Sequence, residues 1–158
     1  MRFLGDSIIP YIGTETFKLG DTLQNVRTYL KGNKIRFNQS VNPNKGCTPE
    51  VPWTFIEIEK SITLCFVKDI LFEILLENEY KGVLPNGCSI GTKMSELEKL
   101  DPTLQYNDAD EDFISENGYW IGDEIETGLI CSITVFLPEV DSDDFFEYEW
   151  LEKYMKKA

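Results

Sequence analysis

Residues 53–76 read WTFIEIEKSITLCFVKDILFEILL and carry the strongest strand signal in the chain. Three runs rich in β-branched and aromatic residues are separated only by Lys60-Ser61 and Lys68-Asp69. Links of two residues leave room for antiparallel hairpins and none for a crossover helix. The stretch therefore predicts an antiparallel meander.

Two short helices are expected on either side of the meander. Leu23, Val26 and Leu30 recur every three or four residues, which is the spacing of one apolar helix stripe. Residues 90–101 repeat this pattern and stop before Pro102, whose ring prevents the helix from continuing.

Shorter patterns predict the remaining elements. Residues 35–38 and 104–107 alternate as short strands do, and residues 119–121 and 129–137 predict two more strands. Residues 142–157 are expected to form a C-terminal helix, because acids occupy its first turn and lysines its last. The predicted fold is α+β, with helices on one face of an antiparallel sheet.

The length of 158 residues favours a single domain over residues 1–158. Within it, Leu19-Gly20-x-x-Leu23-x-x-Val26 matches Ile90-Gly91-x-x-Met94-x-x-Leu97 at an offset of 71 residues. This match suggests a tandem repeat of a helix-then-sheet unit, with halves 8–78 and 80–138. One face of the resulting sheet would be free to bind.

The repeated layout resembles that of β-lactamase inhibitor proteins and of small outer-membrane assembly lipoproteins, whose units begin with a Gly-x-(Ser/Thr)-x-x-x-(Val/Leu) helix. The resemblance rests on Gly20 to Leu30 and on Gly91 to Leu100, with the strands that follow each. It implies a concave sheet face that grips another protein.

The entire net charge of −13 lies in the last third of the chain. The segment from Asp101 to Glu152 holds sixteen Asp or Glu residues and no Lys or Arg, whereas acids and bases are equal in number over residues 1–100. The segment is also rich in apolar residues, so it is expected to fold. A folded surface of one sign favours a basic protein partner and disfavours nucleic acid.

Catalytic and metal-binding signatures are missing from the sequence. The chain has no His, which excludes Ser–His and Cys–His nucleophile pairs and imidazole metal sites. An EF-hand loop starting at Asp108 fails, because Phe113 and Tyr119 stand where Gly and Glu are needed. We therefore expect no enzyme activity, no metal and no cofactor, with a carboxylate-pair hydrolase as an alternative.

The cysteines are expected to be structural, and the lack of long apolar runs suggests a cytoplasmic location. None of the four Cys residues forms a Cys-x-x-Cys pair, and three lie in or beside predicted strands, where they are interpreted as small buried apolar residues. No apolar run approaches eighteen residues and no export signal is recognisable at the start, so we expect a cytoplasmic protein without a membrane contact.

A small acidic α+β character is combined in this chain with the segments Tyr80-Lys81-Gly82-Val83, Ile90-Gly91-Thr92, Leu100-Asp101-Pro102, Gly118-Tyr119-Trp120-Ile121 and Ile133-Thr134-Val135. In these features the chain resembles the bacterial immunity proteins of contact-dependent growth inhibition and related polymorphic toxin systems. The resemblance implies an inhibitor that binds one cognate toxin, often a nuclease.

A contact surface for this partner is expected among the acids of the last third. It comprises Asp108, Asp110, Glu111, Asp112, Asp123, Glu124 and Glu126, with Tyr119 and Trp120 as aromatic anchors. Asp143, Asp144 and Glu147 form a second candidate patch. A scaffold or interaction module with another partner is the remaining alternative.

Overall fold

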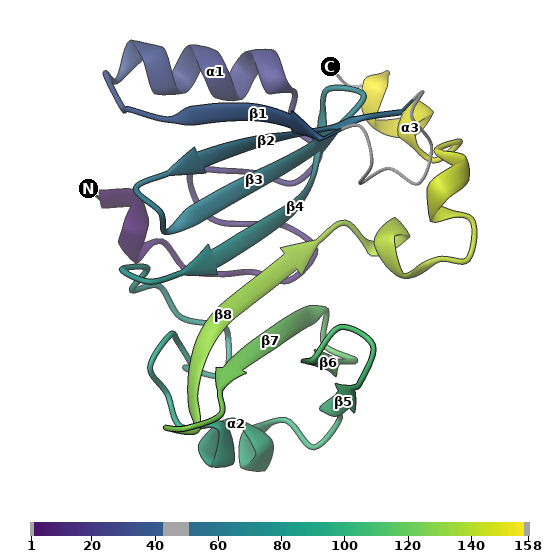
Figure 1. The fold of residues 1–158 in the computed structure, drawn as a ribbon. Helices are drawn as coiled ribbons and strands as arrows, with labels where there is room; N and C mark the ends of the chain where they lie inside the picture. Colours follow the sequence, from purple (N-terminus) through teal and green to yellow (C-terminus); the bar gives the residue numbers. More distant parts are fainter. Residues whose placement is uncertain (1, 43–50, 157–158) are drawn as a thin grey trace.

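The computed structural model describes residues 2–42 and 51–156 and has the predicted α+β architecture. Within these residues the strands form one antiparallel sheet in the order β1-β2-β3-β4-β8-β7-β6-β5 (Figure 1). The strands are β1 (Asn38–Asn42), β2 (Trp53–Ile58), β3 (Ile62–Val67), β4 (Ile70–Glu77), β5 (Gln105–Asn107), β6 (Asp112–Ser115), β7 (Tyr119–Glu124) and β8 (Leu129–Phe136).

The predicted meander is confirmed as β2, β3 and β4. The link between β3 and β4 has the two predicted residues, 68–69, whereas the link between β2 and β3 has three, 59–61. β6 was not expected as a strand, because it begins at Asp112, the last residue of the acidic run.

Both main helices pack on the same face of the sheet, which we call the helix face. They are α1 (Leu23–Gly32) and α2 (Met94–Leu100), and a short 3₁₀ helix, η1 (Arg2–Gly5), precedes them. Leu30 of α1 and Leu97 of α2 are fully buried in one apolar cluster with sheet residues such as Leu64 and Ile133. Figure 1 shows α1 and α2 at opposite ends of the molecule.

The two halves share their topology and the geometry with which each helix starts. Each half is a helix followed by four strands, and the last strands, β4 and β8, pair with each other. The Gly20 N–H donates to the Leu71 carbonyl at 2.8 Å, and the Gly91 N–H donates to the Ile130 carbonyl at 2.8 Å. The two glycines have φ values of 93° and 94°, which suit a residue without a Cβ. The contacts match in the two halves, and the tandem repeat stays a prediction.

The C-terminal segment does not form the helix expected over residues 142–157. It instead contains η2 (Pro138–Asp141), η3 (Phe145–Glu147) and α3 (Leu151–Met155). Tyr148 has a φ of 59°, a left-handed conformation that interrupts a helix, and residue 157 lies outside the described residues. Phe145 and Leu151 pack on Val67 and Phe72, so this segment covers part of the face opposite the helices.

Candidate functional site

The acids predicted to bind a partner lie mainly in two hairpin turns of the second half. Residues 108–111 connect β5 to β6, and residues 125–128 connect β7 to β8. β6 begins next to the end of β7, because Phe113 pairs with Ile121 in an antiparallel register. The two turns therefore lie toward the same end of their hairpins. We call Asp108, Asp110, Glu111, Asp112, Asp123, Glu124 and Glu126 the acidic-turn surface.

Tyr106 lies in the middle of the acidic-turn surface and was missed by sequence reasoning. Its ring is 52% exposed and packs edge-on against Phe113, with centroids 5.2 Å apart. Desolvation, followed by the charges of Glu111, Asp108 and Asp123, raises the pKa of its hydroxyl group. Carboxylates of the β5–β6 turn and of β7 thus act on one side chain. Its place beside Phe113 follows from strand register, which the sequence does not display.

Asp112 differs from its neighbours because it is half-buried. Burial, and then the charge of Asp110, raises the pKa of the Asp112 carboxyl group. Asp110 itself is exposed and accepts a hydrogen bond from the Asn107 side-chain amide at 3.2 Å. Asp108, Glu111, Glu124 and Glu126 are exposed as expected, and Asp123 is half-buried.

The two predicted aromatic anchors point to opposite faces of β7, because successive residues of a strand alternate. Tyr119 is only 2% exposed and belongs to the core on the helix face, so the prediction that it anchors a partner is wrong. Trp120 is half-buried on the opposite face, where its ring lies 4.4 Å from that of Phe136. Trp120 alone remains available as an anchor.

The hydroxyl group of Tyr119 donates to Asp101, a fully buried carboxylate at the end of α2. Asp101 also accepts from the Ser115 hydroxyl at 2.5 Å and from the Thr103 hydroxyl at 2.6 Å. Burial raises the pKa of Asp101, but these hydrogen bonds outweigh it and hold the pKa well below its ordinary value. Since both carboxylate oxygens accept from the protein, Asp101 ties α2 to the β6–β7 hairpin.

The second candidate patch lies on the C-terminal segment. Asp143, Asp144 and Glu147 are all exposed, and Asp144 accepts a hydrogen bond from the Ser142 hydroxyl at 2.8 Å. This patch belongs to a different part of the sequence and of the sheet from the acidic-turn surface.

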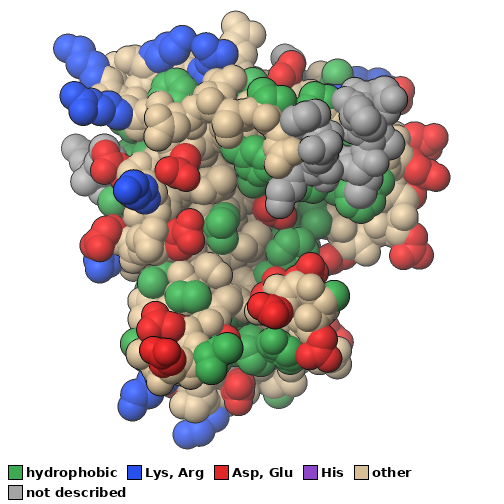
Figure 2. All heavy atoms as spheres, in the orientation of Figure 1, with side chains coloured by type: hydrophobic (Ala, Val, Ile, Leu, Met, Phe, Trp, Pro, Cys, Tyr) green, Lys and Arg blue, Asp and Glu red, His purple; other side chains and the backbone are tan. Residues whose placement is uncertain are grey.

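Positive charge concentrates at the other end of the molecule. Figure 2 shows Lys and Arg side chains gathered over α1, with a smaller group at the opposite end, and Asp and Glu side chains beside hydrophobic ones over the second half. Among the described residues, the two salt bridges join Lys81 to Glu79 and Lys153 to Glu139. Neither involves the acidic-turn surface, so its negative field is not neutralised by an ion pair there.

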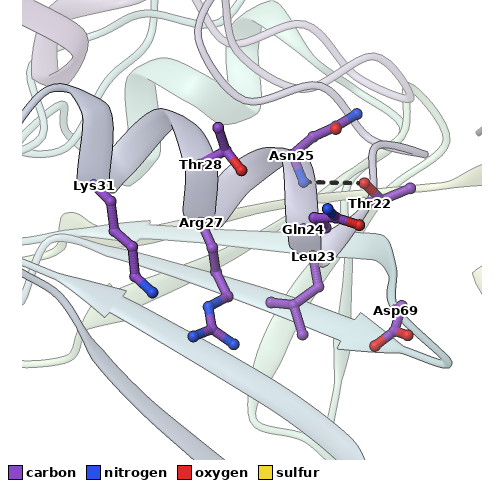
Figure 3. Close-up of a pocket in the computed structure, with 8 residues that line it drawn as sticks. All are labelled: Thr22, Leu23, Gln24, Asn25, Arg27, Thr28, Lys31 and Asp69. Atoms are coloured by element: carbon purple, nitrogen blue, oxygen red, sulfur yellow. Dashed lines mark hydrogen bonds between the residues drawn. The ribbon is translucent and has the colours of Figure 1, made fainter.

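The hollows of the surface are open and lie away from the acidic turns. One, of about 530 Å³, runs along α1, where Arg27 and Lys31 point the same way and Asp69 is the one carboxylate among the lining residues (Figure 3). Another, of about 640 Å³, contains Glu57 and Glu59 together with cationic side chains. A third, of about 280 Å³, is lined by Pro10, Pro85, Asn86, Leu100, Asn117 and Tyr119.

Cysteine and acidic side chains do not assemble into a metal-binding group of three or more within residues 2–42 and 51–156. Cys65 and Cys88 are buried as predicted, whereas Cys131 is exposed, contrary to the expectation for a strand cysteine. Cys47 lies outside the described residues. Cys131 is exposed because a bulge in the pairing of β7 with β8 lies beside it.

No helix in the described part of the chain is long and apolar enough to cross a membrane. Comparison with known proteins found no matching protein-family model, no matching curated protein and no matching solved structure.

Proposed function

We propose that the protein is an immunity protein that binds and neutralises a cognate toxin in the cytoplasm of a bacterium. The toxin is basic and of the nuclease type, and the acidic-turn surface supplies the complementary charge. The protein acts as an inhibitor and not as an enzyme.

The observation that carries this proposal is that acids of the β5–β6 turn and of the neighbouring strands lie around one exposed side chain, Tyr106. Desolvation, and then the charges of Glu111, Asp108, Asp123 and Asp112, raises the pKa of its hydroxyl group. Hairpins present these charges, and no salt bridge among the described residues neutralises them. Such a field favours fast encounter with a cationic cleft.

Co-expression with the product of the adjacent upstream gene tests the proposal. Expression of that neighbour alone is expected to arrest growth of a bacterial host, and co-expression of the protein is expected to restore it. The two proteins should then copurify at physiological salt. A neighbour that is not toxic, or whose toxicity the protein leaves unchanged, would contradict the proposal.

A further inference from the structure

One row of side chains crosses the sheet on the face opposite the helices. In register, Leu75 of β4 faces Thr134 of β8, Thr134 faces Trp120 of β7, and Trp120 faces Ile114 of β6. We call these four residues the open row. Leu75 and Trp120 are half-buried and Ile114 is 36% exposed, whereas Thr134 between them is buried, so three of the four positions reach the surface. Strand spacing gives the row a length of about 14 Å.

Two buried polar atoms in or beside this row lack hydrogen-bond partners. They are Nε1 of Trp120 and Oδ1 of Asp112, and they are the two such side-chain atoms in residues 2–42 and 51–156. The other two tryptophans are satisfied, because Trp53 donates to the Tyr148 hydroxyl at 3.0 Å and Trp150 donates to the Phe145 carbonyl at 2.9 Å. A buried N–H group without an acceptor lowers the stability of the fold. A rotation of the Trp120 ring that brought Nε1 to an acceptor would remove this cost.

Acidic side chains border the open row. Glu57 extends it at one end, since Glu57 faces Thr63 and Thr63 faces Leu75. Glu77 and Asp112 lie along one side, each two residues from a member of the row on the same face. Burial, and then the charge of Glu57, raises the pKa of Glu77, so these acids already repel one another. A cationic partner would relieve this repulsion.

We propose that the open row is the contact surface for a basic segment of a protein partner, with Trp120 as its anchor. This inference rests on the proposed function and specifies which face of the sheet takes part. Apolar side chains of the segment pack on Trp120 and Ile114, and its Lys or Arg residues face Glu57, Glu77 and Asp112. A length of about 14 Å matches nine or ten residues of a helix.

The indole N–H signals in a ¹⁵N NMR spectrum test this inference without the natural partner. The probe is an amphipathic helical peptide of Lys and Leu with its Leu residues on one face, compared with an all-Lys peptide of equal charge. We expect the Trp120 indole signal, assigned through Trp120→Phe, to shift with the Lys–Leu peptide while those of Trp53 and Trp150 stay in place. The all-Lys peptide should bind more weakly, because it cannot pack on the row.

Two matched variants locate the contact. Ile114→Lys places a positive charge in the open row and is expected to weaken binding of the Lys–Leu peptide about tenfold or more. Val41→Lys makes the same change of charge on exposed β1 and should leave binding unchanged. The spectra also show whether each variant is folded.

A stationary Trp120 signal, equal binding of the two peptides, or equal effects of the two variants would overturn the inference. Each of these results leaves the proposed function standing, since the acidic turns could still attract a toxin. Failure of the co-expression test with a shifted Trp120 signal would instead reject the toxin as the partner and keep the contact surface.

Discussion

Asp101 has the most unusual environment of any acid in the described residues. It is 1% exposed, and it accepts hydrogen bonds from three hydroxyl groups and from the Thr103 N–H at 3.0 Å. Such a carboxylate is stable in its charged form only while all of these donors stay in place. The acid nearest to the start of the negative segment is therefore a structural residue and not part of its surface field.

Asp101→Asn should lower the free energy of unfolding by about 2 kcal/mol or more, because it removes the charge that strengthens these hydrogen bonds. Urea denaturation at pH 7 measures the change. Asp108→Asn, at an exposed position, is the matched control and should change stability by less than about 0.5 kcal/mol.

The same carboxylate links stability to pH. Its folded pKa lies below the unfolded value of about 3.9, so its contribution is present above about pH 4 and is lost as the pH falls through the folded pKa. The difference in stability between the wild type and Asp101→Asn should therefore narrow below about pH 4. A difference that stays constant down to about pH 2 would contradict this assignment.

At the scale of elements, the sequence predicts what local spacing determines. The meander over residues 53–76 follows from the strand-like runs of apolar residues and their short links. The glycine-led starts of α1 and α2 follow from two matching sequence patterns. The C-terminal segment could not be predicted in this way, since ring packing between Phe145 and Trp53 and between Phe145 and Trp150 overrides a favourable charge pattern. The first of those contacts joins distant parts of the sequence.

The candidate site shows the same division. The acids of the two turns were predicted from charge alone, but Tyr106 enters the site through the pairing of β5 with β6. Tyr119 and Trp120 are adjacent in one strand, so alternation allowed only one of them to face a partner. Which one is buried depends on the register of β7 with β8.

The paired glycines give a test of the element that both halves share. A methyl group added at Gly91 would meet open space, whereas a Cβ on Gly20 would lie 3.0 Å from the Tyr154 ring. Gly91→Ala should cost about 1–2 kcal/mol from its positive φ alone. Gly20→Ala should cost more, because Tyr154 must move and its 2.8 Å hydrogen bonds to Glu139 are disturbed.

Urea denaturation of both variants measures these losses. Since the backbone conformations are alike, any excess in Gly20→Ala reports the contact with Tyr154. Equal losses of stability would show that Tyr154 and the C-terminal segment move aside at no cost in free energy.

At the scale of the whole molecule, positive and negative charges are unevenly distributed between the two halves. Arg27 and Lys31 project from α1 at one end, and the acidic turns lie in the other half of the sheet. A molecule with a net charge of −13 and such a separation should orient a basic partner before contact. Salt should weaken this orientation, because the Debye length is only about 8 Å at physiological ionic strength.

Reversal of three exposed acids tests this steering. Asp108, Asp110 and Glu111 are changed together to Lys, and association with the proposed toxin partner is followed by stopped flow at low salt. The rate constant should fall about tenfold or more, with little change in melting temperature. The matched control reverses Glu59, Glu96 and Glu98, which are also exposed but belong to neither candidate patch. A similar fall in the control would place the attraction in net charge and not in the acidic-turn surface.

The pairing of β4 with β8 has a consequence for biosynthesis. β4 is complete at Glu77, yet its partner strand begins only at Leu129, about fifty residues later. A nascent chain therefore leaves the ribosome with an apolar strand edge exposed until the second half has been translated. Truncation before β8 should yield a product that chaperones retain or proteases remove, and never a soluble half-protein.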